Sequence, residues 1–570
     1  MNTITGMLLL LSVPGLPLLL LLPALRSRLY RPCHLALLPA ITLLAVPEDL
    51  SIKVPWLLFG TGLGVDGTAR LLLAMSVVLW IAATFLQTRS DQTVDNRYTI
   101  FFLLTMAGNL GAILATDLVG FFTFSTLMGY GFYGLLVADG NEAARRAGRV
   151  YLGFLIVADL ALLEALLIAA TTTTDLGFEA IRNLIGQSPA SGFYLSMVLA
   201  GFALKAGAWP LHFWLPLAFR SARPAVALLL GGVPVAIALL GMVRWLPLGE
   251  LALTDLGVAI QWVGLTAAIY GTVAGLRQFH PRTVLAYAGI VVTGLFVATL
   301  GSGLEWPIIG SSIKETAHLF ILYSGFMLAA LVSGSVLADK IKTRHALHAP
   351  LLAGHAAGAL LLALAPAMVL FLCWIPADAG PLVADSGMVA LWPWWTLCTT
   401  LLAVRWLYLL LHHQQEAVSV PPPAVWIIWG VLLAATVTTG LLAATWSDDP
   451  MGVAADACWP LVVGILIGSS AWWMAAKNWL PAIPVIPPGD LWSILERWLS
   501  RSNRWAMSMG HQVLPRWRAA VLATADRCLQ VRTWQKALDA GERSLQSWTL
   551  AVTLLLLLGI AIAIATGSLT

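Results

Sequence analysis

A lysine close to two prolines inside an apolar segment is the first feature of this sequence that could do chemistry. Lys205 lies in GFALKAGAWPLHFWLP, followed by Pro210, His212 and Pro216. A charge at the centre of a membrane helix costs roughly 2.5–3.5 kcal/mol, so charges kept there are usually functional. Proline breaks a helix, and transporters place ion sites at broken helices. Because burial disfavours the charged form of lysine, Lys205 is predicted to release and regain a proton.

Two carboxylates and a further histidine complete the set of candidate ion-carrying residues. Asp159 and Glu164 lie in the apolar segment VYLGFLIVADLALLEALLIAA. Five residues correspond to about 140° around a helix, so the two are not expected to share a partner, and either could neutralise Lys205. His318, in KETAHLFILYSG, is a weaker candidate because a lone histidine on a helix is more often a packed core residue.

Composition determines the class of protein that holds these residues. The chain has 570 residues, of which 59% are hydrophobic and 11% are charged, with a formal net charge of +4. Soluble chains carry roughly 25% charged residues. This composition excludes a soluble enzyme, a disordered chain and a nucleic-acid-binding protein, and it predicts a polytopic membrane protein. The five cysteines are scattered without a CxxC pair, so no metal site or cofactor is expected.

Windows of about 20 apolar residues predict an all-α protein with about 14–16 transmembrane helices. Pro366 and Pro376, in LALAPAMVLFLCWIPADAG, indicate a second broken helix. Paired breaks of this kind are typical of an internal inverted repeat. The predicted parts are N-terminal helices over 1–98, a first repeat half over 99–246, a second half over 257–411, C-terminal helices over 412–487, a lateral amphipathic helix over 488–546, and a last transmembrane helix over 547–570.

The segment over 488–546 differs from the rest because it is basic and rich in tryptophan. Its apolar and basic residues recur every three or four positions, as in an amphipathic helix that lies in the membrane interface. It is predicted to lie on lipid headgroups or, alternatively, along neighbouring subunits.

The motifs around Lys205 resemble those of the antiporter-like subunits of respiratory complex I, Mrp cation/proton antiporters and membrane-bound hydrogenases. LKAGAWPLHFWLPLAFRSARPAVALLLGG is similar to the family pattern of a Lys followed by P-x-H-x-W-L-P. QFHPRTVLAYAGIVVTG, ETAHLFILYSGFMLAALVSG, GVDGTARLLL and TDLVGFFTFSTLMGYGFYGLL resemble further family segments. The basic C-terminal stretch with a last span resembles the lateral helix of the distal subunit of the complex I arm.

The chain also departs from the family pattern at expected charged positions. The family's fifth helix carries F-x-x-W-E, whose Glu pairs with the Lys, but Ser125 and Thr126 stand at the matching positions. A second Lys or His is replaced by apolar residues around Val235 and Ala236, and a further Lys is replaced by Leu322. The charged residue of the second broken helix is absent around 374–376. The row of titratable residues is therefore predicted to be partly degenerate.

The resemblance implies a proton- or cation-translocating subunit of a multisubunit energy-converting complex, with other membrane subunits and the lipid bilayer as partners. Such a chain would be a non-catalytic subunit of any translocating oxidoreductase. One alternative is a scaffold subunit that has lost translocation. Another is the membrane subunit of a two-component inorganic-carbon uptake system. A soluble redox or zinc-containing subunit is a further partner that these hypotheses allow. A bacterial-type inner membrane is the expected location, and the ion remains open between H⁺ and Na⁺.

Overall fold

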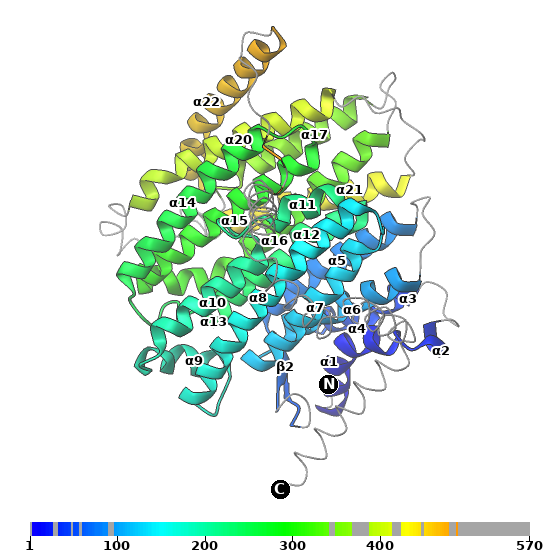
Figure 1. The fold of residues 1–570 in the computed structure, drawn as a ribbon, viewed down its shortest axis with the longest axis vertical. Helices are drawn as coiled ribbons and strands as arrows, with labels where there is room; N and C mark the ends of the chain where they lie inside the picture. The colour runs from blue at the N-terminus through cyan, green and yellow to red at the C-terminus, as the bar shows by residue number, and fades with distance from the viewer. Residues whose placement is uncertain are drawn as a thin grey trace, which may run out of the picture. The chain divides into compact units, whose positions relative to one another are not determined.

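The computed structural model describes residues 3–26, 32–46, 49–55, 60–88, 96–340, 348–367, 387–412, 423–445, 450–477, 486–487 and 489. Apart from Gly489, the predicted lateral helix and last span lie outside these residues, as does Pro376. Within the described part of the chain, ten helical segments are long and apolar enough to cross a membrane, and five shorter apolar helices accompany them. The protein is therefore an all-α, multi-pass membrane protein (Figure 1).

The N-terminal region holds short helices, one hairpin and one long helix. Its elements are α1 (Thr3–Leu19), α2 (Pro23–Arg26), α3 (Pro32–Leu35), α4 (Leu38–Leu44), β1 (Leu50–Lys53), β2 (Gly62–Val65) and α5 (Gly67–Thr88). The two strands pair antiparallel, with Leu50 opposite Val65. α3 and α4 are separated by a turn between Leu35 and Leu38, within the apolar segment Cys33–Leu44.

The region predicted as the first repeat half folds into eight α-helices and one short 3-10 turn. They are α6 (Asn96–Leu114), α7 (Leu118–Val137), α8 (Glu142–Thr172), α9 (Phe178–Leu184), the turn Ile185–Gln187, α10 (Ser191–Ala206), α11 (Trp214–Ser221), α12 (Pro224–Gly232) and α13 (Pro234–Trp245). Side chains at the starts of two helices satisfy free backbone N–H groups. Asp117 accepts from the Gly120 N–H at α7, and Asn141 accepts from the Ala144 N–H at α8.

The remaining helices belong to the second half and the C-terminal region. They are α14 (Thr254–Leu276), α15 (Pro281–Glu305), α16 (Pro307–Lys340), α17 (His348–Leu364), α20 (Gly387–His412), α21 (Pro423–Ala444) and α22 (Pro450–Ala476). Proline is the first residue of α15 and α16, where its missing N–H leaves no intrahelical bond unmade. The described residues of α15 are almost all buried, so this helix lies at the core of the bundle.

In both predicted halves, an arginine donates hydrogen bonds to backbone carbonyls at the end of another helix. At the end of α13, the Arg244 guanidinium donates to the carbonyls of Ala112, Ile113 and Ala115 at the C-terminal end of α6. In the last turns of α20, Arg405 donates to the Gln278 carbonyl just after α14, at 2.7 Å. In each half, an arginine on the last helix therefore satisfies carbonyls at the end of the first helix.

Candidate functional site

The break next to Lys205 is a true helix end rather than a kink. α10 ends at Ala206, and Gly207 takes the left-handed conformation (φ +64°) that lets the chain leave the helix. Pro210 lies in the link to α11. Pro216 was expected to end the run, but it lies in the first turn of α11, where a missing N–H is tolerated. Lys205 therefore occupies the last turn of α10, not the middle of one continuous span.

Lys205 forms a buried ion pair with Asp159 of α8. The Lys205 Nζ lies 2.8 Å from Asp159 Oδ1, and the two side chains are only 6% and 10% exposed. Lys205 also donates to Ser125 Oγ at 3.2 Å, and Thr126 Oγ1 donates to the same Asp159 oxygen at 3.0 Å. Three helices, α7, α8 and α10, thus meet at one lysine and one carboxylate.

The structure separates the two carboxylate candidates of α8. Asp159 is buried against Lys205, whereas Glu164 is exposed on the outer face of the helix. The exposed residues around Glu164 include Leu160, Leu163 and Leu167, so this face of α8 points away from the bundle. Glu164 is therefore not placed to pair with Lys205, in agreement with the angle between the two carboxylates along the helix.

This geometry accounts for the missing glutamate of α7. The residue at the glutamate position, Thr126, contributes a hydroxyl, and the carboxylate comes from Asp159 on the next helix. The anion has moved from one helix to its neighbour while the lysine keeps a buried acidic partner. Sequence comparison of α7 alone suggests a loss of the pair, but the spatial arrangement retains it.

A small, mostly apolar cavity lies beside Lys205 and reaches Pro234 of α13. It has a volume of about 10 Å³, room for about one water molecule. Its lining residues are Ser125, Met128, Gly129, Tyr151, Leu155, Leu204, Lys205, Trp214 and Pro234. Because Pro234 begins α13 and has no N–H, the chain breaks between α12 and α13 at Val233. Together α12 and α13 form one segment, Pro224–Trp245, that is long and apolar enough to cross a membrane.

The positions at which the family pattern has further charged residues are apolar and buried in the fold. Val235, Ala236 and Leu322 are all buried. A second cavity of about 10 Å³ is lined by Val235, Thr293 and Ser324 among others. Among the residues lining these two cavities, Lys205 is the charged one.

The two histidine candidates lie apart from the pair. His212 is fully buried in the link between α10 and α11, with its ring centroid 5.1 Å from that of Tyr270 on α14. His318 is buried in the fourth turn of α16. It lies one turn beyond Lys314, a residue at the edge of a large polar cleft. Neither histidine belongs to the lining of the small cavity beside Lys205.

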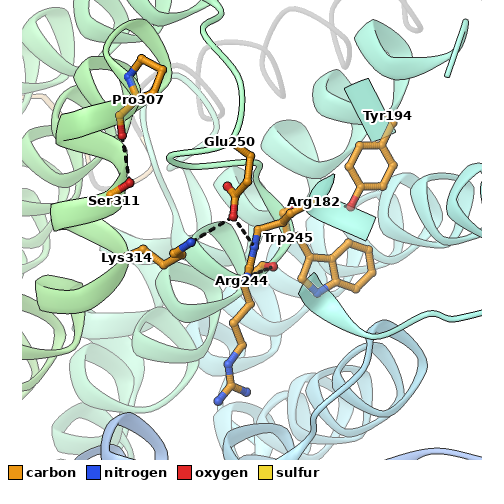
Figure 2. A network of polar contacts seen from close by, with 8 residues as sticks. All are labelled: Arg182, Tyr194, Arg244, Trp245, Glu250, Pro307, Ser311 and Lys314. Atoms are coloured by element: carbon orange, nitrogen blue, oxygen red, sulfur yellow. Dashed lines mark hydrogen bonds and ion pairs between the residues drawn. The ribbon is translucent and has the colours of Figure 1, made fainter. Parts of the chain in front are cut away.

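The polar cleft is a feature that the sequence analysis missed. It has a volume of about 1170 Å³ and is lined by both acidic and basic side chains, among them Asp66, Asp117, Glu179, Arg182, Arg244 and Lys314. Figure 2 shows Glu250 bridging two of the cations: its Oε1 is 3.3 Å from Arg182 Nε and 3.0 Å from Lys314 Nζ. These residues are far apart in sequence, and only folding brings them together.

The second predicted break is seen in part. α17 ends at Leu364, and Pro366 lies in the turn that follows, as expected. Pro376 lies outside the described residues. Within the described ranges, no three His, Cys, Asp or Glu side chains are grouped closely enough to hold a metal ion.

Comparison with known proteins identifies similar sequences and folds. The family model "NADH:quinone oxidoreductase/Mrp antiporter, TM" matches residues 115–404. A probable K⁺/H⁺ antiporter protein of Rhizobium meliloti is 27% identical over 288 residues, which are 48% of this chain and 52% of that protein. NADH-quinone oxidoreductase subunit M of Escherichia coli K12 is 24% identical over 290 residues, 47% of this chain and 57% of that protein. The chain thus spans about half the length of these curated relatives.

Solved structures share the fold at lower sequence identity. A chain of the Mrp complex from Dietzia sp. DQ12-45-1b has a TM-score of 0.65 at 18% identity, covering 93% of this chain and 63% of that one. A chain of the archaeal membrane-bound sulfane sulfur reductase has a TM-score of 0.62 at 16% identity, covering 80% and 98%. The second of these is an archaeal respiratory membrane complex.

Proposed function

Because the chain belongs to the NADH:quinone oxidoreductase/Mrp antiporter transmembrane family, we propose that it is a proton- or cation-translocating subunit of a multisubunit membrane complex. The observation that carries this proposal is the buried pair of Lys205 and Asp159 at the end of a broken helix. The relatives and the structural neighbours are subunits of such complexes, which supports partners that are themselves membrane subunits.

The pair works as a charge-sensitive gate for one proton. With Asp159 ionised, its carboxylate holds the Lys205 ammonium at 2.8 Å. A proton that reaches Asp159 neutralises the carboxylate and releases the ammonium toward the cavity beside Pro234. Lys205 then passes a proton to water in that cavity, and on its return the neutral amine takes the proton from Asp159, which restores the ion pair. A charge change in a neighbouring subunit shifts this equilibrium, because the two groups titrate as a coupled unit.

The break in α10 is what makes this motion feasible. Lys205 lies in the last turn of α10, so the helix fixes its backbone. The residues that follow form the link to α11 and not another helical turn. The Trp214 indole donates to the Leu204 carbonyl at 2.9 Å and so satisfies one of the carbonyls freed at the helix end. The lysine can therefore move without leaving that carbonyl unpaired.

A scaffold without translocation is the second candidate. The buried apolar residues Val235, Ala236 and Leu322 favour it, since they interrupt the row of titratable groups. The retained ion pair argues against it, because an ion pair in the interior is a poor way to gain stability. A scaffold would function equally well with an apolar residue in place of Lys205.

Purification from the native membrane, combined with one substitution, tests the proposal. The tagged protein is extracted in mild detergent and the co-purifying chains are identified by mass spectrometry. Ion flux is then compared for the wild type and Lys205→Met in vesicles. We expect several membrane subunits, unchanged in the variant, and a flux reduced at least 10-fold. Unchanged flux in the variant would support the scaffold, and a single soluble zinc protein as partner would support inorganic-carbon uptake.

A further inference from the structure

His355 is a buried histidine of the second half that the family motifs do not include. It lies in α17 and is only 3% exposed. Its Nδ1 is 2.7 Å from the Leu351 carbonyl oxygen in the preceding turn of the same helix. Its Nε2 is 3.0 Å from the Gly334 carbonyl oxygen on α16. Both ring nitrogens therefore face an oxygen that can only accept a hydrogen bond.

This arrangement matches one protonation state of the ring. A neutral imidazole carries one N–H and can donate to one carbonyl, which leaves the lone pair of the other nitrogen against an oxygen. At 2.7 and 3.0 Å neither contact leaves space for a water molecule. An imidazolium donates from both nitrogens and satisfies both carbonyls. Hydrogen bonds from a charged donor are also stronger than neutral ones.

Two tryptophan rings and a glycine enclose His355. The centroids of the Trp406 and Trp429 rings lie 5.7 and 5.0 Å from that of His355, and both rings are tilted against the imidazole. At Gly334 a Cβ atom would lie 2.9 Å from Trp429 Nε1 and 3.3 Å from His355 Nε2. Glycine at this position is what allows the imidazole and the indole to approach α16 so closely.

Ion pairs do not account for a charge on His355 in the described part of the chain. On α16, Tyr323 donates its hydroxyl to the Leu361 carbonyl of α17. On α20, Arg405, the residue before Trp406, donates to the Gln278 carbonyl. α21 contains no charged residue. In the described ranges no carboxylate forms an ion pair with His355, so the two carbonyls are the groups that would stabilise a charge on the ring.

We propose that His355 is a proton-binding site in the second half of the chain, held as an imidazolium between the Gly334 and Leu351 carbonyls. Its ligand is H⁺. This inference goes beyond the proposed function, because it concerns a different half of the protein and does not require Lys205 to transfer a proton. The site places a titratable group in a region where the expected lysines are apolar residues.

Nitrogen NMR of the full chain in lipid nanodiscs, with labelled histidine side chains, tests the proposal. The His355 signals are assigned by their loss in His355→Gln. At neutral pH we expect two protonated ring nitrogens for His355 and the same pattern in Lys205→Met. One protonated and one bare nitrogen would overturn the proposal. Because the Lys205→Met sample reports on His355 separately, failure of this inference is distinguishable from failure of the translocation proposal.

A matched glycine pair keeps the test decisive if His355→Gln does not fold. Gly334→Ala places a methyl group against Trp429 and His355, whereas a Cβ at Gly430, next to Trp429 in sequence, meets nothing within 4 Å. We expect Gly334→Ala to remove the Nε2 proton signal of one histidine and Gly430→Ala to leave all histidine signals in place. A spectrum of Gly334→Ala identical to that of the wild type would contradict the site.

Discussion

Replacing Asp159 with asparagine should stop translocation by removing the charge that holds Lys205 protonated. The substitution keeps the size of the side chain and one acceptor oxygen. At a separation of 2.8 Å and an effective dielectric constant of about 20, the attraction between two unit charges is about 6 kcal/mol. An energy of about 6 kcal/mol corresponds to a factor of roughly 10⁴ in the proton occupancy of Lys205. The protonated form of Lys205 would then lose the main interaction that stabilises it.

Glu164→Gln is the matched control for this experiment. Glu164 lies on the same helix, five residues further along, and also carries a negative charge, but it is exposed on the outer face. The same charge is removed from α8 in both variants, so any difference between them measures the position of the charge. Both variants are made in the full complex and compared in sealed vesicles with a fluorescent pH indicator and a cation-sensitive dye.

We expect Asp159→Asn to reduce ion flux at least 10-fold and Glu164→Gln to change it by less than about twofold. Asp159→Glu, which restores the charge on a longer stem, should recover part of the flux. The reasoning would be refuted by wild-type flux in Asp159→Asn, or by equal losses in Asp159→Asn and Glu164→Gln. Subunit composition measured on the same preparations shows whether a loss of flux comes from failed assembly.

Three further predictions concern stability and hydrogen bonding. Lys205→Met alone should lower the free energy of unfolding by about 3–5 kcal/mol, because it leaves the Asp159 carboxylate buried without its cation. Adding Asp159→Leu should restore most of that free energy without restoring ion flux. Thermal unfolding in detergent measures the stability of the two variants. Thr126→Val removes the hydroxyl that donates to the Asp159 carboxylate, so it should lower the free energy of unfolding by about 1.5–3 kcal/mol. It should also slow the ion flux several-fold. An unchanged flux would argue against a role for this hydroxyl. Glu250→Gln removes the anion between Arg182 and Lys314, and it should cost about 3 kcal/mol with little dependence on salt, because the Glu250 and Arg182 side chains are only 17% and 14% exposed. Thermal unfolding at low and high salt measures this, and a loss that disappears at high salt would contradict it.

The class of the fold follows from composition and periodicity. Apolar segments of sufficient length predict transmembrane helices whatever their packing, and the structure confirms a polytopic all-α protein. Breaks at Pro210 and Pro366 are also predictable, because proline cannot donate the hydrogen bond that continues a helix. The break between α12 and α13 is harder to predict, because the residues that flank Pro234 are apolar on both sides.

The candidate site shows where sequence reasoning ends. Lys205 and Asp159 stand out because charges are rare in apolar segments, but their pairing depends on how α8 packs against α10. The angle between Asp159 and Glu164 shows that one of them faces away, and only the structure shows which one. The Glu250 network joins α9, α16 and a loop, and its charged residues look like ordinary loop residues in sequence. His355 is one histidine in an apolar helix, and nothing in its neighbours predicts two carbonyls around the ring.

Infrared difference spectroscopy during turnover tests the central claim most directly. The claim is that a proton passes through the buried pair, so Asp159 must be protonated during part of the cycle. The account predicts a band of a protonated carboxyl group that forms during turnover, is absent in Asp159→Asn, and persists in Glu164→Gln. A turnover spectrum without such a band, or a band that survives in Asp159→Asn, would contradict the account.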